Sequence, residues 1–153
     1  MKKLVLIALM VTPLFFISCS DDDDTTEVST TYTLDAISDS GVSGTAKFVK
    51  VDSVTTRVEL QLQNTVADTI HPAHIHINDA VTGGGIAITL NNVDGNTGSS
   101  ITTVTKLDDE GDTTGEAINY EGLLAFDGHI NVHLSPTELQ TIVAQGNIGS
   151  NVQ

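Results

Sequence analysis

The amino-acid sequence predicts an all-β fold, an antiparallel β-sandwich with one short helix near the C-terminus. Apolar and polar residues alternate through much of residues 31–153, as they do in strands with one buried and one wet face. The alternating segments are short, rich in Thr, Val and Ile, and separated by clusters of Gly, Asp and Asn that favour turns. About 120 residues in this part of the chain make one domain of ordinary size.

The clearest strand is RVELQLQ at residues 57–63, in which Val58, Leu60 and Leu62 face one way and polar side chains face the other. Weaker alternation predicts strands at residues 32–36, 44–48, 86–90 and 100–106. HIHIN at residues 74–78 and GHINVHL at residues 128–134 alternate histidine with isoleucine or valine. Seven or so short strands at this spacing are typical of a sandwich.

The helix is expected to begin at residue 135. Ser135, Pro136, Thr137 and Glu138 form a capping box with proline at the first helical position. Leu139 and Ile142 follow as a small apolar stripe, so the pattern predicts a helix of about two turns.

Residues 1–18 are expected to be a signal peptide. Two lysines precede an apolar run at residues 4–17, which is shorter than the roughly 20 residues of a membrane-spanning helix. Ser18-Cys19 follows this run directly and resembles the lipobox of bacterial lipoproteins, with Phe16 at the position where Leu is usual. The resemblance implies that Cys19 is lipidated, becomes the mature N-terminus and anchors the chain in a membrane.

The stretch SDDDDTTE at residues 20–27 resembles the surface-export signal of lipoproteins in the Bacteroidetes. Residues 19–30 are therefore expected to be the lipidated cysteine with a flexible acidic tether, and residues 31–153 the folded domain. The expected location is the outer membrane, with the domain exposed at the cell surface.

Charge excludes one class of partner. Removal of the signal leaves four basic residues against 20 acidic ones, a net charge near −16. The four are Lys47, Lys50, Arg57 and Lys106. Such a surface repels phosphate backbones, so we expect no nucleic-acid partner, while it attracts cations.

The two histidine strands point to metal chemistry. Because alternate residues of a strand share a face, His74 and His76 lie together opposite their isoleucines, and His129 and His133 lie together in the same way. If the strands are neighbours, His74, His76 and His133 can converge on one copper or zinc ion as neutral imidazoles.

Four further residues are candidates around these three. His71 and His129 are possible additional ligands, and Asp79 and Asp127 are possible ligands or acceptors that orient an imidazole. The alternative interpretation is purely structural: the histidines are polar residues on a half-exposed face that hydrogen-bond to loop carbonyls.

Three segments resemble the CHRD domain, the chordin-type module also found in bacterial proteins. They are GVSGTAKF, HPAHIHIND with the following GGGIAITLNNVDG, and LLAFDGHINVHLSPTELQTIVAQGNIG. The likeness covers about residues 32–149 and implies an immunoglobulin-like sandwich with a non-catalytic role. The closing strand departs from the usual pattern, with Gln145 where arginine is expected.

The histidine strands also resemble the copper-binding strands of copper/zinc superoxide dismutases. That likeness implies copper on His74, His76 and His133 and a superoxide-dismutase-like sandwich. The bridging histidine and the zinc loop of those enzymes have no counterpart here, and the acidic surface opposes the steering of an anion.

The sequence therefore favours a non-catalytic binding or structural module on a surface-tethered lipoprotein, with an extracellular protein or matrix partner. The alternative is a copper- or zinc-binding protein, either a metal carrier or one with weak redox activity. A carbohydrate-binding role is disfavoured by the low aromatic content, 4% of the chain.

Overall fold

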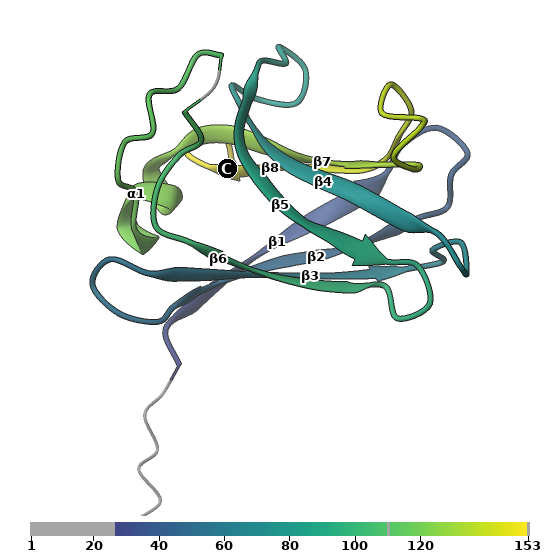
Figure 1. The fold of residues 1–153 in the computed structure, drawn as a ribbon, viewed down its shortest axis with the longest axis horizontal. Helices are drawn as coiled ribbons and strands as arrows, with labels where there is room; N and C mark the ends of the chain where they lie inside the picture. Colours follow the sequence, from purple (N-terminus) through teal and green to yellow (C-terminus); the bar gives the residue numbers. More distant parts are fainter. Residues whose placement is uncertain (1–26, 110, 153) are drawn as a thin grey trace, which may run out of the picture.

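The computed structural model describes residues 27–109 and 111–152, and these form eight strands and one short helix (Figure 1). The elements are β1 Ser29–Ala36, β2 Ser43–Lys50, β3 Thr56–Gln63, β4 Ile70–Ile77, β5 Ile86–Asp94, β6 Ser99–Val104, α1 Tyr120–Ala125, β7 Asp127–His133 and β8 Ile142–Gly149. Each predicted strand coincides with an observed one, so the all-β prediction is confirmed. β8, the closing strand, is eight residues long.

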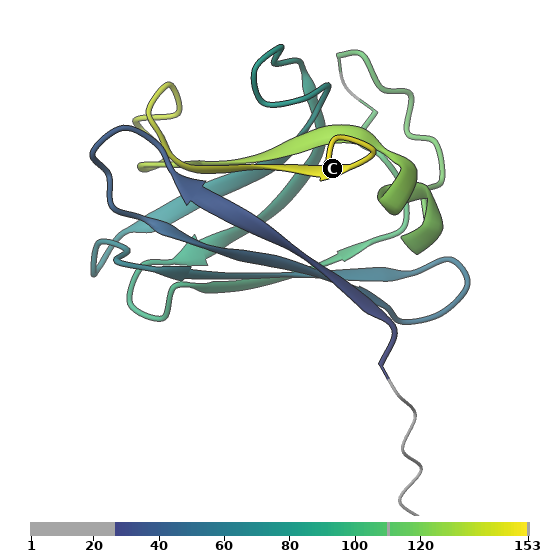
Figure 2. The same cartoon turned by 180° about the vertical axis from the view of Figure 1, so that it is seen from behind.

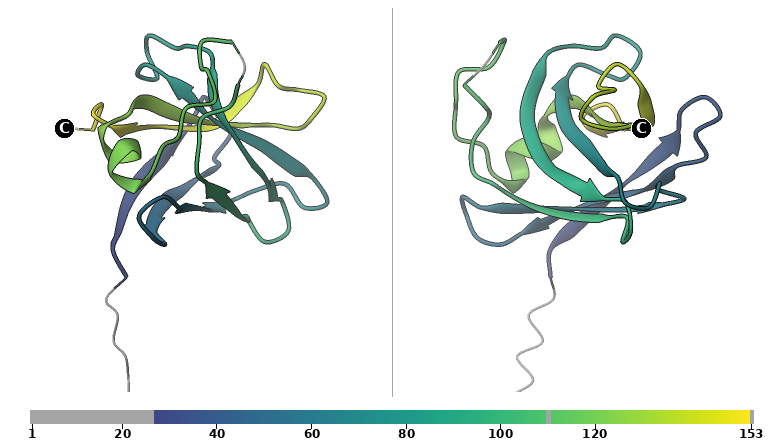
Figure 3. Two further views of the ribbon diagram at one scale, coloured as in Figure 1. Left: turned by 60° about the vertical axis from the view of Figure 1, so that its left-hand side comes forward. Right: turned by 45° about the vertical axis from the view of Figure 1, so that its right-hand side comes forward.

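The strands join into one closed antiparallel barrel in place of the predicted open sandwich. Their order around the barrel is β1-β2-β3-β6-β5-β4-β7-β8. Two seams have few paired residues: Asp94 opposite Ser99 joins β5 to β6, and Asp35–Gln145 and Ala36–Ala144 join β1 to β8. Figures 2 and 3 show this closure from other sides. Because β8 pairs with both β7 and β1, neither half of the barrel is left with a free edge there.

Two crossovers bring the histidine strands together. β3 does not pair with β4, and β6 does not pair with β7, although each couple is consecutive in the chain. As a result, β4 lies between β5 and β7. The order β3-β6-β5-β4 is that of a Greek key. The condition on which the metal hypothesis depended, that the two histidine strands be neighbours, is therefore met.

The core fills the barrel with the apolar faces that the alternation predicted. Phe48, Val58, Ile75 and Ile130 are fully buried. The rings of Tyr32 and Phe48 meet edge to face, with centroids 5.0 Å apart. Since Ile75 and Ile130 point inward, the histidines beside them in sequence point away from the core.

The predicted helix at residues 135–142 is wrong. Glu138 N–H donates to the Ser135 carbonyl and Thr141 N–H to the Glu138 carbonyl, which makes two successive turns. The Ser135 hydroxyl contacts Thr137 Oγ1. The reason is the pairing of Ile142 with His133, which starts β8 and leaves only a short hairpin connection for the capping box.

Within residues 27–109 and 111–152, the one helix is α1, which precedes β7. Its N-cap Asn119 accepts a hydrogen bond from the Gly122 amide at 3.0 Å, and Leu123 is fully buried. The Tyr120 hydroxyl lies 2.8 Å from Thr30 Oγ1 on β1. A single short helix in the C-terminal part of the chain is therefore confirmed, in a different segment.

The predicted signal peptide, Cys19 and most of the acidic tether lie outside the described residues. In the described part of the chain, no helix is long and apolar enough to cross a membrane.

Candidate metal centre

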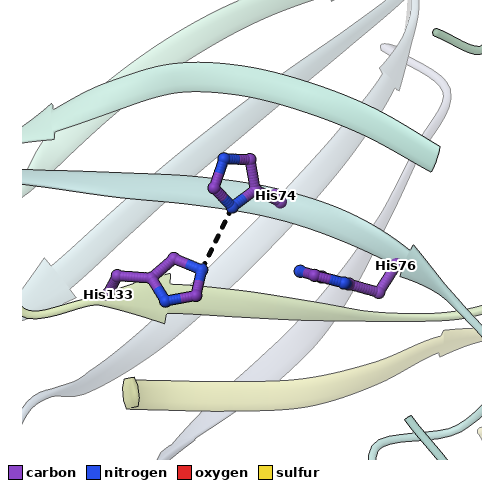
Figure 4. Close-up of side chains that lie close together, drawn as sticks. All are labelled: His74, His76 and His133. Atoms are coloured by element: carbon purple, nitrogen blue, oxygen red, sulfur yellow. Dashed lines mark hydrogen bonds between the residues drawn. The ribbon is translucent and has the colours of Figure 1, made fainter. Parts of the chain in front are cut away.

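Three histidine rings from β4 and β7 converge outside the core (Figure 4). His74 and His76 come from β4 and His133 from the end of β7. Each offers one ring nitrogen, and these three atoms lie within 4.8 Å of one another. These are the three residues that the sequence predicted as ligands, and the fold brings them to one point.

The spacing of the rings is close to that of metal ligands. His74 Nδ1 lies 3.0 Å from His133 Nε2. A tetrahedral ion with metal–nitrogen distances of about 2.0 to 2.1 Å holds its nitrogen ligands about 3.3 Å apart. His74 Nδ1 and His133 Nε2 therefore have nearly this separation already. A movement of at most about 1.5 Å would bring the ligand nitrogen of His76 to the same separation from them.

His76 has the tautomer that a ligand needs. Its Nδ1 lies 3.0 Å from the carbonyl oxygen of Gly84. A carbonyl can only accept, so Nδ1 carries the proton and Nε2 keeps its lone pair. Nε2 is buried and has no hydrogen-bond partner among the described residues. Figure 4 shows this ring with a nitrogen directed towards the other two histidines.

His129 and His71 lie outside the group of three but hold the backbone around it. His129 Nδ1 donates to the carbonyl of Asn78 at 2.8 Å, and its ring stacks on His76 with centroids 5.1 Å apart. His71 is fully buried and donates from Nδ1 to the carbonyl of His133 at 3.0 Å. In this structure both support the site as hydrogen-bond donors.

All three candidate ligands are held neutral. Burial lowers the pKa of His74 to about 4, assisted by repulsion from His133 and His76 and opposed by the charge of Asp108. Burial also lowers the pKa of His76, against the hydrogen bond to the Gly84 carbonyl. The pKa of His133 is lowered by burial and by His76, against a backbone interaction with Leu139. Neutral imidazole is the form that binds a metal ion.

Asp79 and Asp127 contribute no atom to the group of three. Asp79 Oδ1 accepts from the amides of Val81 and Thr82, which caps its own turn. Asp127 Oδ1 accepts from the side chain of Asn151 at 2.8 Å. Among the described residues, the group is therefore three imidazoles with no carboxylate, which leaves a coordination position free.

The free position opens into a cavity of about 330 Å³. Its walls include Ile86, Asn131, Leu139, Gln140 and Ile142 as well as the three histidines. The sequence does not reveal the turn residues Leu139 and Gln140 as part of the site, because the capping-box pattern predicts a helix there. Asn131 shares its strand face with His129 and His133, as the alternation in residues 128–134 predicts.

Gln145 orients Asn131. The Gln145 side-chain amide donates to Asn131 Oδ1 at 2.7 Å, across the β7–β8 ladder. This bond leaves the Asn131 N–H groups as potential donors beside the cavity.

A comparison of the chain with models of protein families found no match, and a search of curated proteins found none. Support for a metal centre therefore comes from the geometry of this chain.

Proposed function

We propose that this domain is a non-catalytic metal-binding module that holds one copper or zinc ion on His74, His76 and His133. The observation that carries the proposal is the convergence of three neutral ring nitrogens from two neighbouring strands to within 4.8 Å. Imidazole suits both ions, and three protein ligands with a free position allow the ion to be received and passed on.

The same geometry weakens the purely structural interpretation of the histidines. Buried side-chain nitrogens in structural networks are normally paired. Here the Nε2 of His76 is buried and unpaired among the described residues. Bound metal would take the lone pair of His76 Nε2, because its Nδ1 proton is already used on Gly84.

Metal titration tests the proposal. The full chain, purified without a histidine tag, is expected to bind near one equivalent of Cu²⁺ or Zn²⁺ at pH 7. Changing both His74 and His76 to alanine should abolish this binding and leave the β-sheet circular dichroism intact, because neither side chain lies in the core.

The matched control is His129→Asn. It also removes one imidazole beside the site, but the asparagine amide can still donate to the Asn78 carbonyl. This variant should bind metal like the wild type. Affinity in the millimolar range for wild type, or equal binding by the double alanine variant, would refute the metal centre.

We further propose that the domain is carried on a surface lipoprotein. The support is the lipobox-like Cys19 and the acidic stretch at residues 20–27. Cys19→Ala is expected to move the protein from the membrane fraction to the soluble one, and unchanged lipid labelling of this variant would contradict the anchor. An extracellular protein or matrix component is then the class of partner that the domain can reach.

We also propose a relation to CHRD domains, and through them an immunoglobulin-like or superoxide-dismutase-like architecture. Support comes from the motifs shared with CHRD domains and from the adjacency of the two histidine strands. The dismutase likeness concerns the histidines only, and the proposed module is not an enzyme.

A further inference from the structure

We infer that His71 is a positioning residue of the metal centre: its ring supplies the hydrogen bond that Pro72 cannot donate and thereby holds the backbone of His133. The affinity test of this inference rests on the proposed metal function. Its structural test, on the metal-free protein, does not.

The β4–β7 ladder has a regular hydrogen-bonding pattern. These strands run antiparallel, with Ala73 opposite Val132. At the far end of the pair, the Asn78 amide donates to the Asp127 carbonyl at 2.9 Å. Asn78 and Asp127 therefore face each other in a position where opposite residues exchange hydrogen bonds.

Such positions alternate along an antiparallel ladder, so every second pair is of this kind. His74 opposite Asn131 is one of them. The next brings residue 72 opposite His133, and there the amide of residue 72 should donate to the His133 carbonyl. Residue 72 is proline, which has no N–H, so this carbonyl loses its donor from the ladder.

His71 replaces the missing donor. Its Nδ1 lies 3.0 Å from the His133 carbonyl oxygen, and the imidazole is completely buried. Since the carbonyl only accepts, Nδ1 must carry the proton. A buried carbonyl without a donor is costly, so the bond has a reason to persist in the folded chain.

The position of this bond connects it to the metal site. His133 is the last residue of β7, and the β7–β8 register shifts between Val132 and His133. The regular ladder at His133 is thus interrupted towards β4, by Pro72, and towards β8, by the register shift. His133 Nε2 nevertheless lies 3.0 Å from His74 Nδ1, so the His71 bond is the contact that holds the His133 carbonyl on the β4 side.

Two substitutions of similar size separate the hydrogen bond from the bulk of the ring. In His71→Asn, the side-chain Nδ2 takes the place of the imidazole Nδ1 and can donate to the same carbonyl. In His71→Leu, no donor remains. Zinc affinity of the full chain, measured by competition with a chelator, should fall 10- to 100-fold in His71→Leu and stay within about threefold in His71→Asn.

Pro72→Ala provides the rescue, because it restores the backbone N–H opposite His133. The double variant His71→Leu with Pro72→Ala should regain most of the lost affinity. A role in general packing would not respond to a backbone amide in this way. Equal affinities for His71→Leu and His71→Asn, or no recovery in the double variant, would overturn the inference.

The positions of the histidine rings in the metal-free protein test the role of His71 independently of metal binding. Nuclear Overhauser contacts between the rings of His74 and His133 should be present in wild type and in His71→Asn and weakened in His71→Leu. If wild type binds no zinc, the proposed function fails while these ring contacts still decide the role of His71. Unchanged contacts in His71→Leu would refute positioning even if metal binds.

Discussion

His74 shows how burial prepares a side chain for metal. Its ring lies on the outer face of the sheet, yet burial, together with the rings of His133 and His76, lowers its pKa to about 4. A free histidine titrates near 6.5, so the fold removes the competing proton across the range from 6.5 to about 4. Metal binding at this site should therefore tolerate mild acid better than binding at an exposed histidine pair.

The same shift predicts a pH dependence of stability in the metal-free protein. Between pH 6.5 and 4 the unfolded chain binds a proton at His74 and the folded chain does not, so acid favours unfolding. The stability of the folded state with respect to His74 is therefore fully present above pH 6.5 and is lost as the pH falls towards 4. A shift of this size corresponds to about 3 kcal/mol for a fully buried ring, and solvent screening reduces it because His74 is only half-buried. We therefore expect the free energy of unfolding, measured with urea and a chelator, to drop by roughly 2 kcal/mol across this window from His74 alone.

His74→Asn is the control for this experiment, since it removes the titrating ring. The variant should show a shallower slope between pH 6.5 and 4.5, with the remainder coming from His76 and His133, whose pKa values are also lowered. A slope as steep as that of the wild type would contradict the assignment.

Individual residues also show what sequence alone could predict of the site. Strand alternation places His74, His76 and His133 on outward faces, and that prediction is confirmed. It cannot supply the distance between His74 and His133, which depends on the two strands being neighbours across 59 residues of chain. Nor can it reveal that the ring of His71 replaces an amide missing at Pro72.

At the scale of elements, strands were predictable and helices were not. A strand is defined by a two-residue period that persists through the segment, as in Val58, Leu60 and Leu62. The capping box at Ser135 is a signal of local preference, and the pairing of Ile142 with His133 overrides it. Helix α1 is only six residues long, too short for a visible apolar period, and its clearest signal is the Asn119 cap.

The β1–β8 seam depends on a glycine. A Cβ on Gly146 would lie 2.1 Å from the backbone carbonyl oxygen of Thr33 on β1, so the two strands would have to separate. We expect Gly146→Ala to destabilise the domain by at least about 2 kcal/mol in thermal or urea unfolding. Thr33→Ala, which keeps the carbonyl, serves as the control at the same seam and should have a much smaller effect.

Charge is unevenly distributed over the whole molecule. Lys47, Lys50 and Arg57 lie on β2 and β3, where they form ion pairs with Glu27, Glu59 and Glu121. Strands β4, β5, β7 and β8, which surround the histidines, contain no lysine or arginine. The half of the barrel that carries the candidate metal centre is therefore the half without basic residues on its strands.

This distribution predicts that salt slows metal capture. The association rate of Zn²⁺, measured by stopped flow, should fall clearly between low salt and about 0.5 M, because ions screen attraction beyond a few ångströms. At low salt, Asp108→Asn should associate with Zn²⁺ more slowly than wild type, because one negative charge near His74 is removed. The asparagine Oδ can still accept the hydrogen bond from the Thr89 amide, so the local structure should be kept. A rate independent of ionic strength would argue against electrostatic capture.

The Greek-key crossover has a consequence for when the protein can acquire its ion. In an extended chain, the pair His74 and His76 exists already, but His133 joins it only after β4 and β7 have docked, since 59 residues separate His74 from His133. A polypeptide that crosses a membrane unfolded therefore carries no complete binding site with it. If the domain is exported as proposed, it draws its metal from the compartment in which it folds, and its occupancy reports the ions available there.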